Sequence, residues 1–370
     1  MTAPALVIFF GGYGPGAAEQ LVDGARLAAT FDLLEQALAS SAFSRIILAT
    51  DVPDRFADAP PGVTVDSDSG PFRFGPRLAQ VIDRYRVDSL VYIGGGSLPL
   101  LTGDELTFLA GRLGRAGSAV IANNSYSSDL IAVSPARMVT EIAERCVNDN
   151  SLARLLAEAF SLQVETLPWT LTWQFDIDGP ADIAILKLAG RGGPCLATYL
   201  ASADIDLSRY QRVSSVLVDR TRQLFVAGRA GSRSWQYLER ETACRVRFFS
   251  EERGMMADGR IAARDARSLL GFYLEDTGIE RFFAVLPELC DAAVIDTRVL
   301  LAHTGATPSR EDRFQSDLGE HSHIDNSFLR EFTHAAETAT VPVLLGGHSL
   351  VSGGLMLLTD YAWESAEKKD

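Results

Sequence analysis

The stretch Phe175-Asp176-Ile177-Asp178-Gly179-Pro180-Ala181-Asp182-Ile183-Ala184-Ile185-Leu186 carries the pattern that decides the fold. We predict a short strand carrying Asp176 and Asp178, a Gly-Pro turn, and a helix that starts at Pro180 or is capped by Asp182. Because side chains alternate along a strand, both carboxylates should lie on one face. Adjacent carboxylates repel each other unless a cation or a proton relieves them, which favours a Mg²⁺ or phosphate-linked site. The alternative is that these acids only complement the dipole of the helix that follows.

Two upstream segments share a layout in which a predicted strand runs into a glycine-rich turn. Residues 5–10 (ALVIFF) form a continuous apolar run, typical of a buried parallel strand, and lead into residues 11–16 (GGYGPG). Residues 89–93 (SLVYI) lead in the same way into residues 94–97 (GGGS). Backbone N–H groups in such a turn can approach a phosphate, so the first turn is a candidate nucleotide-binding loop.

The order and spacing of these motifs resemble nucleotidyltransferases of the glycosyltransferase-A fold, above all molybdenum-cofactor guanylyltransferase and phospholactate guanylyltransferase. The similar segments are residues 96–102 (GSLPLLT), 127–135 (SSDLIAVSP) and 175–183 (FDIDGPADI), and the resemblance ends near Leu188. It implies a mostly parallel sheet flanked by helices, with transfer of a nucleoside monophosphate from a nucleotide to a small phosphorylated or acidic acceptor. Mg²⁺ is the implied cofactor.

The resemblance also implies a role for individual residues. Asp176 and Asp178 would be the catalytic pair and would hold Mg²⁺. The nucleotide would lie at Gly11, Gly12, Gly14, Ser97, Ser128 and Asp129. We expect the glycine loop, Ser97 and the two aspartates to face one cleft at the carboxyl ends of the strands.

Two departures from the family pattern keep a second interpretation open. Ser97 stands where the family has a metal-binding aspartate, and no Lys or Arg occurs between Gly11 and Gln20, so that Arg26 is the first basic residue. Loss of a carboxylate from a hard-cation site removes on the order of several kcal/mol of metal binding. The chain is therefore either an active transferase or a degenerate nucleotide-binding or sugar-phosphate-binding protein, or a scaffold.

Length and composition predict two domains and a cytoplasmic protein. With 370 residues the chain is long for one core, and a Gly/Pro-rich linker at 187–194 divides it into domains 1–190 and 195–370. A net charge of −14 argues against nucleic-acid binding, and no apolar run reaches membrane-spanning length. The four cysteines are scattered, as in a reduced protein. An oligomer is compatible with the sequence.

The second half repeats the alternation of strands and helices, which predicts a second α/β domain. We expect strands at residues 224–228, 244–249, 292–296, 299–302 and 342–345. We expect helices at residues 207–218, 232–242, 262–274 and 327–337, and a glycine-rich helix after residue 349. In such sheets, ligands bind beyond the carboxyl ends of the strands.

Arginines follow one of these strand ends. Arg229, Ser232 and Arg233 combine cations and a hydroxyl at a helix start, which is a candidate site for a phosphate or carboxylate. Residues 191–250 hold ten arginines against five acidic residues, the reverse of the chain as a whole. The alternative is a turn with solvated arginines.

All five histidines occur at or after residue 303. His321 and His323, beside acidic residues, are candidate transition-metal ligands, and His334 is expected to be structural. His348 follows a strand and should be a neutral imidazole able to act as ligand or base. We expect it in one pocket with at least one of Glu251, Glu252, His303 or Arg229. This pattern leaves a metal-assisted hydrolase as a third functional class.

Overall fold

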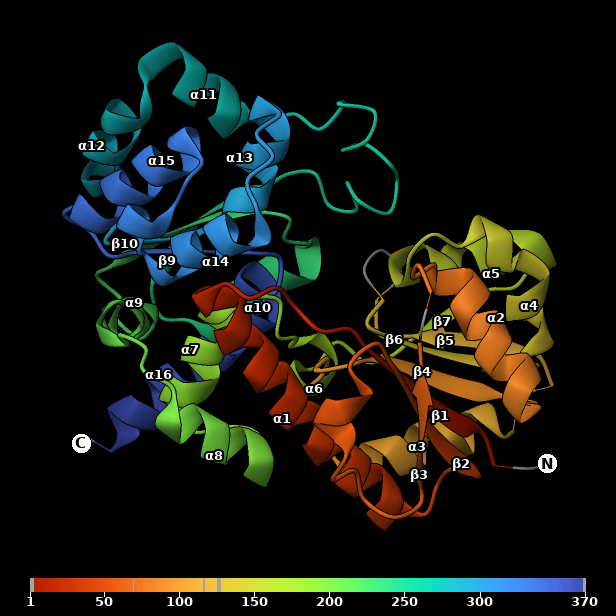
Figure 1. Cartoon of the computed structure of the whole chain (residues 1–370). Coiled ribbons are helices and arrows are strands. Elements are labelled where there is room, and N and C mark those ends of the chain that lie inside the picture. The colour runs from red at the N-terminus through yellow and green to blue at the C-terminus, as the bar shows by residue number, and fades with distance from the viewer. Residues whose placement is uncertain (1–2, 69, 116, 125–127, 369–370) are drawn as a thin grey trace. The chain divides into compact units, whose positions relative to one another are not determined.

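The computed structural model describes residues 3–68, 70–115, 117–124 and 128–368 (Figure 1). The chain forms two compact units. The first comprises Met1–Tyr13, Arg26–Gln174 and Gly193–Leu196, and the second comprises Gly14–Ala25, Phe175–Gly192 and Ala197–Asp370.

The first unit is built on a sheet with the strand order β3-β2-β1-β4-β6-β5-β7. Its strands are β1 (Ala5–Phe10), β2 (Arg45–Thr50), β3 (Val63–Ser67), β4 (Leu90–Gly94), β5 (Ala119–Ala122), β6 (Leu130–Ser134) and β7 (Val164–Thr166). β6 runs antiparallel to its neighbours β4 and β5, and the other neighbouring pairs are parallel. The expected mostly parallel sheet is therefore confirmed.

Helices cover both faces of this sheet. They are α1 (Ala17–Ser40), of which the part from Arg26 onward belongs to this unit, α2 (Phe74–Tyr85), α3 (Gly103–Leu113), α4 (Arg137–Ile142), α5 (Leu152–Phe160) and α6 (Leu171–Gln174). Alternation along the strands divides the core in two: Val7 and Phe9 of β1 pack with α2, α4 and α5, whereas Leu6 and Ile8 pack with α1, α3 and α6. Figure 1 shows α2, α4 and α5 together on one side of the sheet.

The second unit has an all-parallel sheet with the order β11-β10-β8-β9. Its strands are β8 (Gln223–Gly228), β9 (Arg245–Ser250), β10 (Ala292–Asp296) and β11 (Val343–Gly346). Its helices are α7 (Pro180–Ala189), α8 (Pro194–Ser202, from Ala197 onward), α9 (Ser208–Leu217), α10 (Ser232–Glu241), α11 (Leu269–Thr277), α12 (Ile279–Leu289), α13 (Thr297–Thr304), α14 (Arg310–Leu318), α15 (Ser327–Thr338) and α16 (Leu355–Glu367). A second α/β region is thus confirmed.

Helices cover this sheet on both faces too. α11, α12 and α15 pack on one side, where Phe225 and Ile295 of the strands meet Phe282 and Phe332 of the helices. α9 packs on β8, β10 and β11, and α16 packs on α9 (Figure 1). The carboxyl ends of the parallel strands are left for polar residues.

Three expected elements differ in the structure. Residues 175–178 form no strand, although Phe175 and Ile177 are buried as alternation requires. The Ser349 hydroxyl, rather than a neighbouring strand, satisfies the backbone N–H and C=O of Asp176, at 3.3 and 2.8 Å. Residues 299–302 lie in helix α13, because the Asp296 side chain caps a helix that follows β10 directly.

The expected helix at 262–274 begins later. Its N-cap is Ser268, whose hydroxyl accepts a hydrogen bond from the backbone N–H of Gly271, and the helix is α11. A serine three residues before a backbone N–H is the usual N-cap arrangement, so the cap residue sets this start.

In the described part of the chain, none of the helices combines the length and the apolar character that crossing a membrane requires. The four cysteines are free; Cys195 is exposed and the others are buried.

Candidate functional site

The first candidate site lies where the first sheet reverses its strand order. β1 pairs with β2 on one side and with β4 on the other, so the loops that follow β1 and β4 lie next to each other. The loops are joined directly, because the N–H of Gly95 donates to Phe9 O at 2.7 Å. A Cβ at Gly95 would lie 2.7 Å from the Phe10 ring, so this contact requires glycine. Ligands of open α/β sheets bind at such a reversal point.

Arg26 supplies the basic residue that the glycine loop lacks in sequence. Its Nη1 donates to Gly11 O at 3.1 Å, and its guanidinium carbon lies 4.2 Å from the Tyr13 ring centroid. It also contacts the second loop, because a Cβ at Gly96 would lie 2.5 Å from Arg26 Cβ. Sequence reasoning missed this role because Arg26 follows Gly11 by 15 positions; only helix α1 brings it back to the loop.

The backbone of the first glycine loop remains open at one point. The N–H of Gly12 donates to Asp51 Oδ1 at 3.0 Å, whereas a Cβ at Gly11 would meet no heavy atom within 4 Å. Space beside Gly11 therefore remains for a ligand that approaches the backbone.

Ser97 and Asp129 belong to the same unit. Ser97 is half-buried and closes a turn through its N–H to Gly94 O at 3.0 Å. Asp129 is held by buried Asn123, whose Nδ2 donates to Asp129 Oδ2 and whose Oδ1 accepts from the Asp129 N–H, each at 3.2 Å. Burial, then the charges of Asp149 and Asp129, raise the pKa of Tyr92 well above its usual value. The carboxylates therefore place negative charge near β4.

Ser128 has a different environment. It is buried, and its hydroxyl donates to Asn124 O at 2.5 Å. Ser127 lies outside the described residues.

Gly14 belongs to the second unit, where it precedes the start of α1. Two N–H groups at that start are already paired: Ala18 N and Glu19 N donate to the Glu311 carboxylate at 3.1 and 2.9 Å. An anion at this helix end would have to displace Glu311.

Asp176 and Asp178 also belong to the second unit. The helix start was predicted correctly, with Pro180 as the first residue of α7. Asp182 caps it: its Oδ2 accepts from the N–H groups of Asp178 and Gly179, at 2.9 Å each. Asp178 Oδ2 accepts from the Ser349 N–H at 3.3 Å.

Asp182 combines burial with an altered pKa. It is 2% exposed, and its Oδ1 has no hydrogen-bond partner among the described residues. Burial first, and then the negative charge of Asp178, raise the pKa of Asp182 well above its usual value. The raised pKa of Asp182 favours its protonated form, and relief of the repulsion between Asp176 and Asp178 by a cation stays a prediction.

Two ion pairs fill the carboxyl edge of the second sheet. Arg229 follows β8 and pairs with Asp296 at the end of β10, with Nε and Nη2 donating at 2.6 and 3.2 Å. Arg298 pairs with Asp317 of α14 at 2.7 and 2.5 Å. Burial alone would raise the pKa of Asp296, but the Arg229 charge and hydrogen bond hold it below its usual value. Arg298 and Asp317 were not recognised in the sequence.

His348 lies close enough to this cluster to be affected by its charges, and the shared pocket expected from the sequence stays a prediction. The charges of Arg229, Asp178 and Asp296 act on its imidazole. Burial, followed by the Arg229 charge, lowers the pKa of His348, which favours the neutral imidazole. Its Nδ1 is buried without a hydrogen-bond partner among the described residues.

The other expected neighbours of His348 bind elsewhere. Glu251 accepts from the Ser268 hydroxyl at 2.7 Å, and Glu252 pairs with Arg260 at 2.8 Å. His303 Nδ1 accepts from the Ser268 N–H at 3.0 Å. These three residues surround the start of α11.

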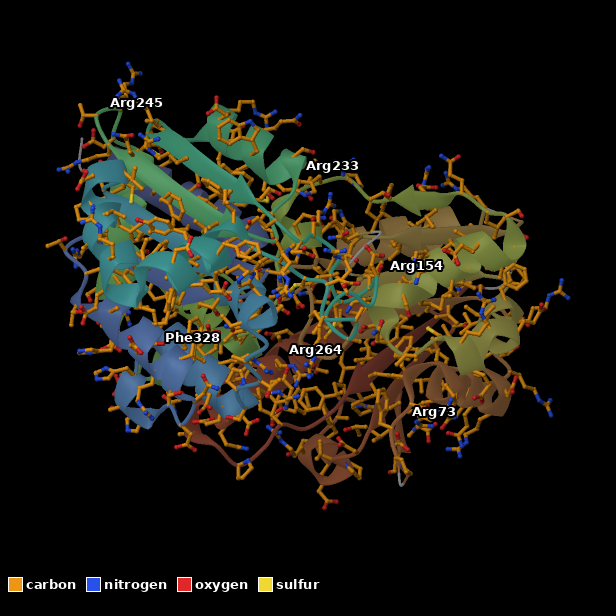
Figure 2. The ribbon with its side chains drawn as sticks, turned by 90° about the horizontal axis from the view of Figure 1, so that it is seen from above. Arg73, Arg154, Arg233, Arg245, Arg264 and Phe328 are labelled. Carbon is orange, nitrogen blue, oxygen red and sulfur yellow. The ribbon has the colours of Figure 1, made fainter. Side chains whose placement is uncertain are left out.

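The remaining candidates are more exposed. Ser232 and Arg233 are exposed in the first turn of α10, and Figure 2 labels Arg233 there. His323 is 65% exposed, 3.8 Å from Glu320, while His321 Nδ1 lies 2.6 Å from Glu337. The structure therefore gives His321 and His323 separate partners.

No family model and no curated protein matches this chain. A solved structure from Desulfovibrio desulfuricans G20, described as a nucleotide-diphospho-sugar transferase, is 16% identical, covers 56% of this chain and 100% of its own, and has a TM-score of 0.40. A cytidylyltransferase from Leptospira borgpetersenii is 14% identical, covers 51% and 86%, and has a TM-score of 0.39. CMP:2-keto-3-deoxy-manno-octonic acid synthetase, solved with CTP, is 14% identical, covers 45% and 89%, and has a TM-score of 0.34. Similarity at this level assigns no activity to the chain.

Proposed function

We propose that the protein is nucleotidyltransferase-like and that its first unit binds a nucleoside triphosphate at the loops that follow β1 and β4. One observation carries the proposal: these loops adjoin where the strand order reverses, with Arg26 against both. Backbone N–H groups and a guanidinium are the donors that a triphosphate requires. The motif resemblance supports transfer of a nucleoside monophosphate to a small phosphorylated or acidic acceptor.

The second unit contains the carboxylates that would hold Mg²⁺. Asp176, Asp178 and Asp182 supply hard oxygen donors, and the unpartnered Asp182 Oδ1 is a buried carboxylate oxygen that a cation would satisfy. The donor set therefore suits Mg²⁺. When bound, Mg²⁺ neutralises charge on phosphate oxygens. The resemblance implies that Asp176 and Asp178 would hold the ion. Within the first unit, Arg26 would stabilise negative charge on a bound nucleotide.

Gly11→Ala tests nucleotide binding at the first loop. Nothing lies within 4 Å of a Cβ at Gly11, so the variant should fold normally, and a methyl group should interfere only with a ligand that approaches the backbone. Calorimetry with ATP, GTP, CTP and UTP, with and without Mg²⁺, should show at least one nucleotide bound by the wild type. Its affinity should be about tenfold lower in Gly11→Ala, equivalent to ~1.4 kcal/mol.

Gly111→Ala is the matched control. Gly111 occupies an exposed position of α3, and a Cβ there also meets nothing within 4 Å. Equal affinity in Gly11→Ala and Gly111→Ala would remove the loop from the site. Binding without any nucleotidyl transfer, over a panel of phosphorylated and acidic acceptors, would favour the degenerate binding protein over the enzyme.

Hydrolysis in the second unit is a second candidate function. The specific observation is His348, whose Nδ1 is buried and without a partner among the described residues, and whose pKa is lowered by burial and by the Arg229 charge. A neutral imidazole can activate water as a general base, and an adjacent arginine can stabilise an anionic transition state. Carboxylates of the same cluster could hold the metal that the sequence-based hypothesis includes.

A further inference from the structure

A histidine pair and a glutamate come together on the outer side of helix α15, away from the sites described above. α15 is packed through Leu329, Phe332 and Ala336, which are buried. His334 and Glu337 lie three residues apart on this helix, so they point from neighbouring positions of one face. His321 comes from the 3-10 turn His321–His323, between α14 and α15.

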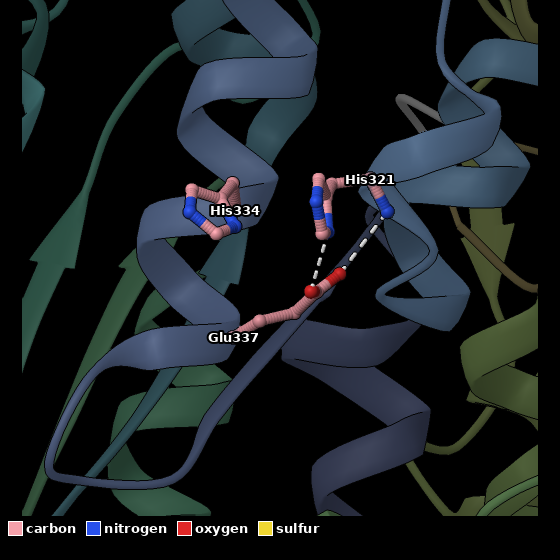
Figure 3. Close-up of side chains that lie close together, drawn as sticks. All are labelled: His321, His334 and Glu337. Atoms are coloured by element: carbon pink, nitrogen blue, oxygen red, sulfur yellow. Dashed lines mark hydrogen bonds and ion pairs between the residues drawn. The ribbon is translucent and has the colours of Figure 1, made fainter.

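The three side chains lie within reach of one ion. His321 is held to Glu337 twice, through its N–H to Oε1 at 3.1 Å and through Nδ1 to Oε2 at 2.6 Å. The His321 and His334 rings are 4.4 Å apart between centroids. One ligand atom from each residue lies within 4.8 Å of the other two, and Figure 3 shows the three side chains facing one another.

We propose that His321, His334 and Glu337 form a binding site for a divalent transition metal ion such as Zn²⁺. Two imidazole nitrogens and one carboxylate oxygen are a donor set that Zn²⁺ takes, with water in the fourth position. Mg²⁺ and Ca²⁺ prefer oxygen donors throughout, so the imidazoles select against both. His334 is exposed, which leaves that face open to solvent and to entry of the ion.

Metal binding at this site needs at most a small closure. Ligands at about 2.1 Å from a tetrahedral ion are about 3.4 Å from one another, closer than the 4.8 Å limit within which these atoms lie. His334 can supply the movement by a change of rotamer, since it is exposed, whereas the backbone hydrogen bond from His321 keeps Glu337 in place. The bound ion would fix the turn at 319–326 to α15.

This assignment differs from the His321 and His323 pair that the sequence suggested. Spacing along the chain placed these two histidines together, but His323 is exposed on the other side of its turn near Glu320. His334 was expected to be structural, and the structure brings its ring to His321 instead. A helix position 13 residues away could not be linked to the turn without the packing of α15 on it.

Zn²⁺, Co²⁺ and Mg²⁺, each added to the full-length chain after treatment with a chelator, test the proposal. Calorimetry should show one Zn²⁺ per chain and no comparable Mg²⁺ binding. Co²⁺ should give the visible absorption of a low-coordinate site containing nitrogen ligands. His334→Gln and His321→Gln should each weaken Zn²⁺ binding by about tenfold or more and remove the Co²⁺ spectrum.

His323→Gln is the matched control, because this neighbouring histidine is outside the cluster and should leave the Zn²⁺ affinity unchanged. Circular dichroism in the presence of chelator should be the same for His334→Gln and the wild type, so a loss of binding cannot come from unfolding. Zn²⁺ binding by His334→Gln as tight as in the wild type, or equal loss in His323→Gln, would overturn the site. So would the absence of Zn²⁺ binding by the wild type.

Discussion

Both sheets of this chain contain parallel strands, but different residues lie at the carboxyl ends of these strands in the two units. In the first unit these ends carry glycine loops in which Gly11 is exposed, and Arg26 donates a hydrogen bond to the Gly11 carbonyl oxygen. In the second, Arg229 and Arg298 are each paired with a buried aspartate. The carboxyl ends of parallel strands therefore leave a place for a ligand in the first unit and hold an internally neutralised cluster in the second.

The difference shows that arginines at a strand end do not by themselves make an anion site. A phosphate at Arg229 would compete with Asp296, whose Oδ2 lies 2.6 Å from Arg229 Nε. The Asp296 side chain is buried, so the cost of removing it from water has already been met on folding. A ligand at Gly11 meets no such competitor, because the space beside it is open. The first unit is thus the better candidate for phosphate, and the second for chemistry that needs a fixed electrostatic environment.

Asp296→Asn should lower the stability of the second unit by more than any other change proposed here, because it leaves the partly buried Arg229 without its counter-charge. The Arg229 side chain is 19% exposed and that of Asp296 is fully buried. Removing one partner of a buried pair typically destabilises by about 3 kcal/mol or more. Hydrogen exchange of β8 and β10 peptides should show the loss of protection in the second unit.

Glu364→Gln is the control for that variant, since Arg191 and Glu364 form an exposed pair in the same unit, with side chains 48% and 46% exposed. Its effect should stay below about 1 kcal/mol. An equally small effect of Asp296→Asn would show that the second sheet edge is more hydrated than its burial indicates, and the contrast between the two units would weaken.

His348→Gln should abolish any hydrolysis that the second unit catalyses. Loss of a general base lowers kcat by about 100-fold, equivalent to ~2.7 kcal/mol of transition-state stabilisation. Because burial and Arg229 lower its pKa, the wild-type rate should stay high to a pH below the usual imidazole value of about 6.5. Assays with phosphate esters and carboxylic esters measure both effects; an unchanged rate in His348→Gln would end the hydrolase hypothesis.

Asp182→Asn should change the pH dependence of stability. Because the pKa of Asp182 is raised on folding, the folded chain keeps a proton that the unfolded chain releases at about pH 3.9. The stability that Asp182 contributes is present below that pH and is lost as the pH rises toward its folded pKa. Asparagine cannot ionise, so its stability does not change in this way. Between pH 4 and the folded pKa of Asp182, the free energy of unfolding of the variant should rise relative to that of the wild type by about 1.4 kcal/mol per pH unit.

Asp206→Asn should change the pH dependence of stability in the opposite direction. The hydrogen bonds from Ser208 lower the pKa of Asp206, so its contribution is present at higher pH and lost as the pH falls. Denaturant unfolding between pH 4 and pH 7 measures the effect of Asp182→Asn, and unfolding below pH 4 measures the effect of Asp206→Asn. Parallel pH profiles for Asp182→Asn and the wild type would mean that a cation, and not a proton, relieves the carboxylates at the start of α7.

Local signals in the sequence predicted the elements, and long-range contacts decided the sites. Pro180 and the buried run at 5–10 predicted a helix start and a strand correctly, because each depends on neighbouring residues alone. Residues 299–302 are apolar in a way that suits either a strand or a helix, and the Asp296 cap decides for the helix. The proximity of Arg26 to Gly11, and of Arg298 to Asp317, depends on helix packing that no short motif encodes.

The cap at the start of α1 has a consequence for how this protein could acquire or lose a ligand. Glu311 supplies, from its own chain, the negative charge that a helix start would otherwise take from solution. The Glu311 carboxylate therefore competes with any dissolved anion for the start of α1, and because it is part of the same chain its effective concentration there exceeds that of a dissolved ion. Evolution could open this helix end by a single substitution at position 311, with no change to α1 itself.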